Sequence, residues 1–271
     1  MLYEQIEEIL PLVQKPGRYT GGELNSVVKD KSKVSLRFAF CFPDTYEIGM
    51  SHLGIKILYS LINSRDNYWC ERVFAPDCDM EKIMRERYIP LFGLESRDSL
   101  KDFDCIGFTL QYELSYTNIL NMLDLAGLEV RAENRPDTLD APLVIAGGPC
   151  VSNPEPLADF FDAFQIGEGE EMMLEFLDLL DEYKKKGATK KEFLVAASRI
   201  KGIYVPSLYD VSYNSDGTVK AYTPLCGAPK TVDKRVVADI DKMFYPEKFV
   251  VPFVEIVHDR VVAEIFRGCI R

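Results

Sequence analysis

The chain has 271 residues, of which 47% are hydrophobic and 28% charged, the composition of an ordinary globular protein with a substantial core. Its formal net charge of −11 argues against a broad nucleic-acid surface, which needs clustered lysine and arginine. The N-terminus lacks the basic and apolar regions of a signal peptide, and no apolar run approaches the roughly 18 residues of a membrane span. Seven cysteines without repeated spacing favour a cytoplasmic location over a disulfide framework.

The first part of the chain, residues 1–33, is predicted to be a short helical extension. Apolar residues from Tyr3 to Val13 have helical spacing, and Lys15-Pro16-Gly17 then breaks the helix. A polar segment leads from there into the first strongly apolar run.

Strands and helices alternate through residues 34–187. Strands are expected at 34–44, 69–75, 104–110, 141–149 and 162–170, and helices at 55–63, 80–87, 117–126 and 171–186. Such alternation implies right-handed crossovers, a parallel sheet and helices on both of its faces. The sequence therefore predicts an α/β domain of the Rossmann-like or flavodoxin-like type.

The pattern changes after Gly187. Residues 188–248 are expected to form a small β-rich connector, with a helix at 190–199 and a hairpin turning at 214–217. Residues 249–271 are predominantly apolar and predict a further strand.

Three loops follow predicted strands and are candidates for ligand binding, because ligands of open parallel sheets bind outside the carboxyl ends of the strands. Their glycines either only turn the chain or let backbone N–H groups approach a ligand. His52 either touches a cofactor or only begins a helix. The candidate cofactor-binding residues are Ser51, His52, Leu53, Gly54, Gly147, Gly148, Gly167, Glu168 and Gly169.

Several familiar site types are disfavoured. Neither glycine loop matches G-x-G-x-x-G, and no G-x-x-x-x-G-K-[ST] occurs, which argues against dinucleotide and P-loop triphosphate binding. Two histidines, His52 and His258, cannot build a three-histidine zinc site. Glu170 and Glu171 can simply favour the positive end of the helix that follows them. No catalytic residue can be named.

Four phrases carry a resemblance to a known family: KPGRYTGGELNSV, FPDTYEIGMSHLGIKILYSLI, LVIAGGPCVSNPEPLADFFDAFQIGEGEE and EIVHDRVVAEIFRGCIR. In this order they resemble the N-terminal half of radical S-adenosylmethionine (SAM) proteins with a cobalamin-binding-like domain. The resemblance implies that a barrel follows, with a [4Fe–4S] cluster on C-x3-C-x2-C and bound SAM. Cys269 would be the first cluster cysteine, with the other two beyond the chain end, and residues 249–271 would begin the truncated barrel.

The sequence departs from the cobalamin-binding pattern at one motif. The family's D-x-H-x-x-G supplies a histidine ligand to cobalt, whereas Met50 precedes His52 at the aspartate position and Ile55 replaces the glycine. The resemblance thus implies that cobalamin, if bound, is held without a histidine lower ligand. It also implies that this chain is inactive without its partner, the missing barrel, whose substrate is unknown.

Two other functions remain open. The domain could be a substrate-recognition or protein-interaction module that kept the fold but lost cobalamin, which the broken histidine motif favours. It could also be an independent flavodoxin-like binder of a nucleotide or flavin, which the missing phosphate motifs disfavour.

Overall fold

The computed structural model describes residues 2–268. The helices are α1 (Leu2–Ile9), α2 (Tyr46–Gly49), α3 (Leu53–Asn63), α4 (Cys78–Glu86), α5 (Tyr116–Leu125), α6 (Gly169–Lys185) and α7 (Lys190–Ala197). The strands are β1 (Leu36–Phe42), β2 (Tyr68–Phe74), β3 (Cys105–Thr109), β4 (Leu143–Gly147), β5 (Ala163–Gln165), β6 (Ile203–Tyr204), β7 (Tyr209–Tyr213) and β8 (Val219–Pro224). Each predicted element between 34 and 199 overlaps one of these.

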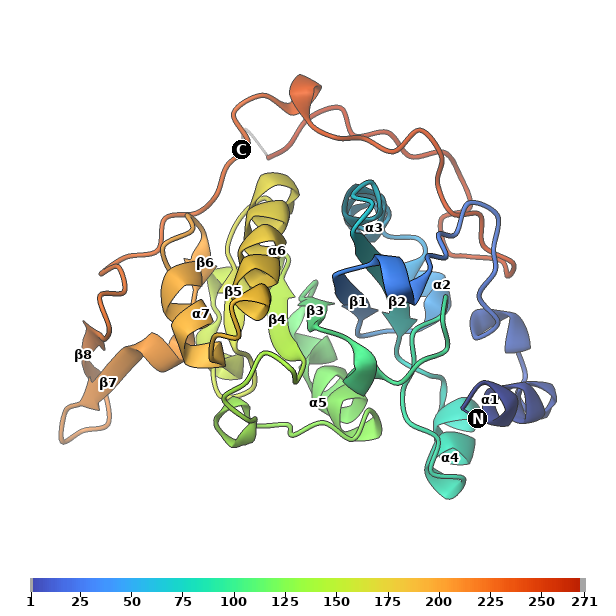
Figure 1. The fold of residues 1–271 in the computed structure, drawn as a ribbon, viewed down its shortest axis with the longest axis horizontal. Coiled ribbons are helices and arrows are strands. Elements are labelled where there is room, and N and C mark those ends of the chain that lie inside the picture. The colour runs from blue at the N-terminus through green and yellow to red at the C-terminus, as the bar shows by residue number, and fades with distance from the viewer. Residues whose placement is uncertain (1, 269–271) are drawn as a thin grey trace.

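The main sheet has the strand order β2-β1-β3-β4-β5-β6, and the strands from β2 to β5 pair in parallel. Figure 1 shows α3 and α6 on one side of this sheet and α5 on the other. The predicted α/β fold of the Rossmann-like or flavodoxin-like type is therefore confirmed. The direction in which strands are added to the sheet reverses at β1. The chain first adds β2 on one side of β1 and then β3 on the other side. The switch point therefore lies between β1 and β3.

The last strand of the sheet, β6, runs antiparallel to β5, whereas sequence alternation predicts only parallel pairs. The reason is that two helices, α6 and α7, separate β5 from β6. The chain leaves the carboxyl end of β5, and the two helices, which run in opposite directions, return it to that same end of the strands. The next strand, β6, must therefore run opposite to β5. Hence β6 belongs to the sheet although it lies within the predicted connector. The connector's hairpin forms as β7 and β8, but the domain boundaries remain predictions.

Buried charges fix the N-terminal extension to the sheet. Arg72 of β2 donates to Glu23 through Nη2 at 2.7 Å and to Glu95 through Nε at 2.7 Å. The Tyr46 hydroxyl donates to the same Glu23 carboxylate at 2.8 Å. Burial opposes the negative charge of Glu23, but the hydrogen bonds and charge of Arg72 outweigh it and keep the pKa of Glu23 below its usual value.

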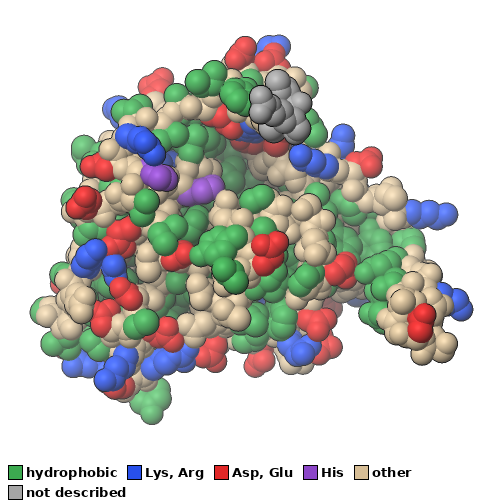
Figure 2. Space-filling view, turned by 180° about the vertical axis from the view of Figure 1, so that it is seen from behind, with side chains coloured by type: hydrophobic (Ala, Val, Ile, Leu, Met, Phe, Trp, Pro, Cys, Tyr) green, Lys and Arg blue, Asp and Glu red, His purple; other side chains and the backbone are tan. Residues whose placement is uncertain are grey.

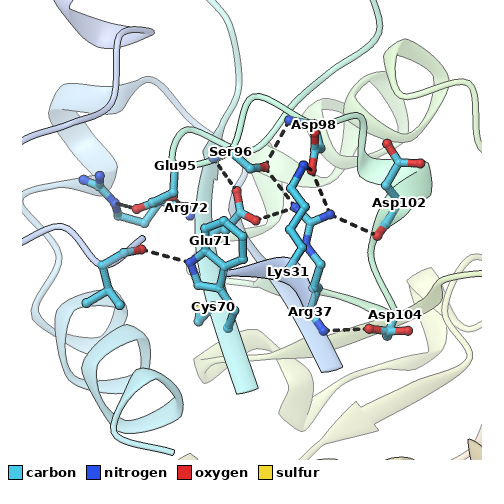
Figure 3. Close-up of polar contacts among 12 residues, drawn as sticks. Lys31, Arg37, Cys70, Glu71, Arg72, Glu95, Ser96, Asp98, Asp102 and Asp104 are labelled. Atoms are coloured by element: carbon cyan, nitrogen blue, oxygen red, sulfur yellow. Dashed lines mark hydrogen bonds and ion pairs between the residues drawn. The ribbon is translucent and has the colours of Figure 1, made fainter. Parts of the chain in front are cut away.

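A second buried pair lies on the neighbouring strand. Arg37 of β1 donates to Glu71 at 2.6 Å and to the Ser96 hydroxyl at 2.9 Å, and the Ser96 amide donates to Glu71 at 2.8 Å. Figure 3 shows this network beside the Arg72–Glu95 pair. Removing one partner of such a pair leaves an uncompensated buried charge, so these contacts hold the segment around residue 96 in one place.

The C-terminal segment, defined here as residues 230–268, forms no α-helix or paired strand. It arches over the side of the sheet that carries α3 and α6 (Figure 1). The strand expected at 249–271 is absent from the described part, where Val251 makes only an isolated bridge to Leu24. The proposed first cluster cysteine, Cys269, lies outside the described residues.

Candidate functional site

A cavity of about 530 Å³ lies at the switch point, on the face of the sheet covered by α3 and α6. The floor of the cavity consists of every second side chain along the strands, and these side chains point to the same face of the sheet. Its walls are apolar residues of the two helices. Figure 2 shows its opening as a hollow beneath the C-terminal segment. The floor includes Phe38, Phe40, Gly107, Ile145 and Gln165, and the walls include Ile57, Leu58, Met172 and Met173.

The floor is shaped by a glycine inside a strand. A Cβ added at Gly107 would overlap Phe38 Cζ and lie 3.1 Å from its Cε1, so the ring of Phe38 lies over the backbone of β3. Glycine within a strand commonly marks such close approach. The result is a smooth apolar slot between the sheet and the helices.

Polar groups in the slot are few. Gln165 is buried, and its amide nitrogen has a distant sulfur partner, Met173 Sδ at 3.7 Å. Thr109 is also buried and accepts a hydrogen bond from Gln111 at 2.5 Å. An apolar pocket with a small number of placed polar groups is the usual form of a site for an organic ligand.

The loop after β1 contributes His52, the N-cap residue of α3. Its ring lies 5.7 Å from that of Phe42, and its Nδ1 is buried without a hydrogen-bond partner among residues 2–268. Burial lowers the pKa of His52, an effect that Gln111 only partly offsets, so the imidazole is neutral at physiological pH.

The loop after β4 contributes two glycines with different roles. Gly148 has a φ of 103°, and an added Cβ would lie 2.8 Å from the Leu110 carbonyl oxygen, so this position requires glycine. Gly147 is different, because the nearest atom to an added Cβ is 3.9 Å away. Gly147 therefore has room for a Cβ where it lines the cavity.

The loop after β5 runs into the start of α6. Gly167 has a φ of 116°, and an added Cβ would collide with the backbone of Arg235. The Glu168 amide donates to the Arg235 carbonyl at 3.0 Å. The C-terminal segment is thus joined to this loop by backbone contacts that only glycine permits.

The mouth of the cavity is acidic. Arg267 donates to Glu264 at 2.7 Å, contacts Glu170 directly and lies 3.7 Å from Glu168. Carboxylates at the first turn of α6 already occupy the positive end of that helix. A phosphate group would be repelled there, which argues against any ligand that places its phosphate at the mouth.

The structure brings together all the predicted cofactor-binding residues except one. His52, Leu53, Gly54, Gly147, Gly148, Gly167, Glu168 and Gly169 all line the cavity. Ser51 does not line it: its hydroxyl donates to the Glu47 carbonyl at 2.6 Å and accepts from the His258 amide at 3.1 Å. Whether these residues bind a cofactor stays a prediction.

Sequence reasoning missed the floor of the cavity and the residues that cover it. Gly107, alone in an apolar strand, was the one local sign of a special position. Lys234, Glu264 and Arg267 reach the cavity from the C-terminal segment, and no local pattern reveals such a contact.

No metal centre is found among residues 2–268, where no group of three or more His, Cys, Asp and Glu residues could hold an ion. The six cysteines of this part are free. In the same part of the chain, no helix is long and apolar enough to cross a membrane.

The fold is that of a doubly wound α/β domain with a cavity at its switch point. Residues 54–206 match the family described as radical SAM proteins, N-terminal. The match covers more than half of the chain, and the chain belongs to this family.

One similar protein is an uncharacterized protein of Methanocaldococcus jannaschii, 29% identical over 179 residues. The match covers 65% of this chain and 33% of that protein, so the chain spans about a third of its relative's length. No solved structure matches the chain.

Proposed function

We propose that the chain is the N-terminal cofactor domain of a radical SAM enzyme and that cobalamin binds in the cavity at the switch point. The observation that carries this proposal is the apolar slot over Gly107, which opens beside Gly147. The family assignment supports the radical SAM part of the proposal.

The cavity suits one part of cobalamin. The dimethylbenzimidazole base of the nucleotide arm is flat and largely apolar, as the slot between β3 and α6 requires, and Gln165 offers it a buried amide; the phosphate of that arm would have to lie away from the acidic mouth. The corrin macrocycle is larger than about 530 Å³ and would have to remain outside. Cobalamin, when bound, supplies a cobalt centre that carries alkyl groups; the residues of this chain would hold and orient it.

We further propose that the cobalt takes no histidine ligand from this chain. His52 is the only histidine at the cavity in the described part, but it begins α3 and stands in a broken D-x-H-x-x-G motif. Its buried Nδ1 has no hydrogen-bond partner among residues 2–268. The motif and the ring's confinement beside Phe42 and Gly54 both favour a structural role.

The chemistry of the whole enzyme would belong to the rest of the parent protein. The family implies a [4Fe–4S] cluster and SAM, whose ligands we place at Cys269 and in a barrel that follows it. The chain would then be inactive alone, with that barrel as its partner. Its free cysteines support a cytoplasmic location.

A second candidate function is substrate recognition by the same cavity without cobalamin. The observation that favours it is the pair of contacts at the mouth of the cavity that Arg267 makes with Glu168 and Glu170. A corrin would need the space that these side chains occupy. A polar substrate could replace these ion pairs.

Retention of cobalamin separates the two functions. The chain is mixed with hydroxocobalamin and desalted, and its visible absorbance is recorded; we expect about one cobalamin per chain. The reduced complex of His52→Ala should give the same electron paramagnetic resonance spectrum as the wild type, without nitrogen splitting, and His258→Ala is the matched control. Splitting that disappears only in His52→Ala contradicts the ligand assignment, and loss of cobalamin from the wild type supports substrate recognition instead.

A further inference from the structure

A second hollow, of about 200 Å³, lies away from the sheet's switch point, between the sheet edge and the β7–β8 hairpin. Figure 1 shows β6 at that edge and the hairpin beyond it. Three tyrosines from three strands line the hollow: Tyr204 of β6, Tyr209 of β7 and Tyr222 of β8. Glu155, from the segment after β4, lines it as well.

Two of the rings are held in place by their own hydroxyl groups. Tyr204 donates to Glu155 Oε1 at 2.6 Å, and Tyr209 donates to the Pro229 carbonyl at 2.8 Å. The two ring centroids are 5.2 Å apart, with 42° between the ring planes. Tyr204 also stacks on Phe164 at 6.1 Å. Because the rings are already ordered, a ligand that contacts them loses little affinity to their immobilisation.

The third ring, Tyr222, is 44% exposed and completes the hollow on the solvent side. The faces of aromatic rings carry negative potential and attract cations, above all methylated ammonium groups. Glu155 adds a carboxylate beside them. Rings and carboxylate together favour a cation whose methyl groups can contact the tyrosines.

Lys230 also lines the hollow, and among residues 2–268 its ammonium group has no hydrogen-bonding or ion-pair partner. It would repel a simple cation but attract an anionic group of the same ligand. We propose that this hollow binds a small zwitterion, with its methylated ammonium against the three tyrosines and Glu155 and its carboxylate on Lys230. Among its lining residues, this site shares Ile166 with the cavity at the switch point.

Calorimetric titration of the 271-residue chain tests the proposal with two probes. Glycine betaine carries a trimethylammonium group and a carboxylate, whereas choline carries the same cation and a neutral hydroxyl. We expect betaine to bind at least about 5-fold more tightly than choline, and Lys230→Gln to remove that difference. Tyr222→Leu should weaken betaine binding about 5-fold, the effect of one cation–π contact, while Tyr222→Phe should retain it.

The matched control is Tyr213→Leu, because Tyr213 is an exposed tyrosine of the same hairpin that does not line the hollow. Thermal unfolding verifies that each variant is folded. The proposal is overturned if folded wild-type chain binds no betaine, or if Tyr213→Leu weakens binding as much as Tyr222→Leu. Equal affinity for choline and betaine overturns the role of Lys230.

Discussion

Substituting Gly107 with alanine tests the floor of the cavity. The added methyl group would overlap the ring of Phe38, which is itself buried. Phe38 would have to leave its rotamer and move into the slot, since the sheet backbone lies beneath it. The variant should therefore lose both stability and ligand space.

The size of the loss follows from two opposed effects. Overpacking of a core costs about 1–3 kcal/mol, whereas replacing glycine by alanine within a strand gains about 0.5–1 kcal/mol from reduced unfolded-state entropy. The net loss is roughly 0.5–2 kcal/mol. At about 2–4 °C per kcal/mol for a domain of this size, the Tm should fall by roughly 1–8 °C.

Thermal and urea unfolding measure this loss, and Gly147→Ala is the matched control. The nearest atom to an added Cβ at Gly147 is Gln165 Cβ, at an ordinary van der Waals distance of 3.9 Å, so that variant should not be overpacked and should gain about 0.5–1 kcal/mol from reduced unfolded-state entropy. In the Gly107→Ala background, Phe38→Leu should recover part of the stability because the shorter side chain lacks Cζ. If Gly107→Ala and Gly147→Ala are equally stable, Phe38 does not lie over β3 as described.

Three further predictions concern charged contacts. Glu23→Gln should lower the free energy of unfolding by on the order of 3 kcal/mol, because Arg72 loses a buried partner; a change below about 0.5 kcal/mol in urea unfolding would contradict this. The hydrogen bond from Arg18 lowers the pKa of Asp77, so its stabilising effect is complete above the unfolded pKa near about 4 and lost as the pH falls through the lower folded value. The protection factors of amides around Arg18, with the pH-dependent intrinsic exchange rate divided out, should fall on acidification from about pH 5 to about pH 2.5, and protection factors that fall instead on going to neutral pH would refute the pairing. Arg267→Gln should speed exchange in the C-terminal segment about 5-fold, the upper range for a partly exposed ion pair, and unchanged exchange would show that Arg267 does not hold it.

The sheet was predictable because its evidence is local. Each predicted strand and helix from β1 to α6 has its own apolar run or helical spacing, and alternation alone implies parallel pairing. The antiparallel β6 has two residues, too few to show a period, and its direction depends on how α6 and α7 pack.

The candidate site was only half predictable. Loops after strands can be found from the sequence because their place in a parallel sheet is fixed, which is why Gly147 and Gly167 could be named. The floor could not be found, because a strand such as β1 is apolar on both faces and its pattern does not say which face a cavity uses. The contact of Ser51 with His258 joins residues 207 positions apart, beyond any local pattern.

The proposed function requires that a ligand, cobalamin, enters the cavity between α3 and α6. Its most direct test is equilibrium binding of hydroxocobalamin to the wild type and to Gly147→Leu, which adds a large side chain to a residue that lines the cavity. We predict that the wild type binds and that Gly147→Leu binds at least about 10-fold more weakly, a loss of about 1.4 kcal/mol, with its Tm nearly unchanged. Equal binding by the two proteins, or no binding by the folded wild type, would contradict the claim.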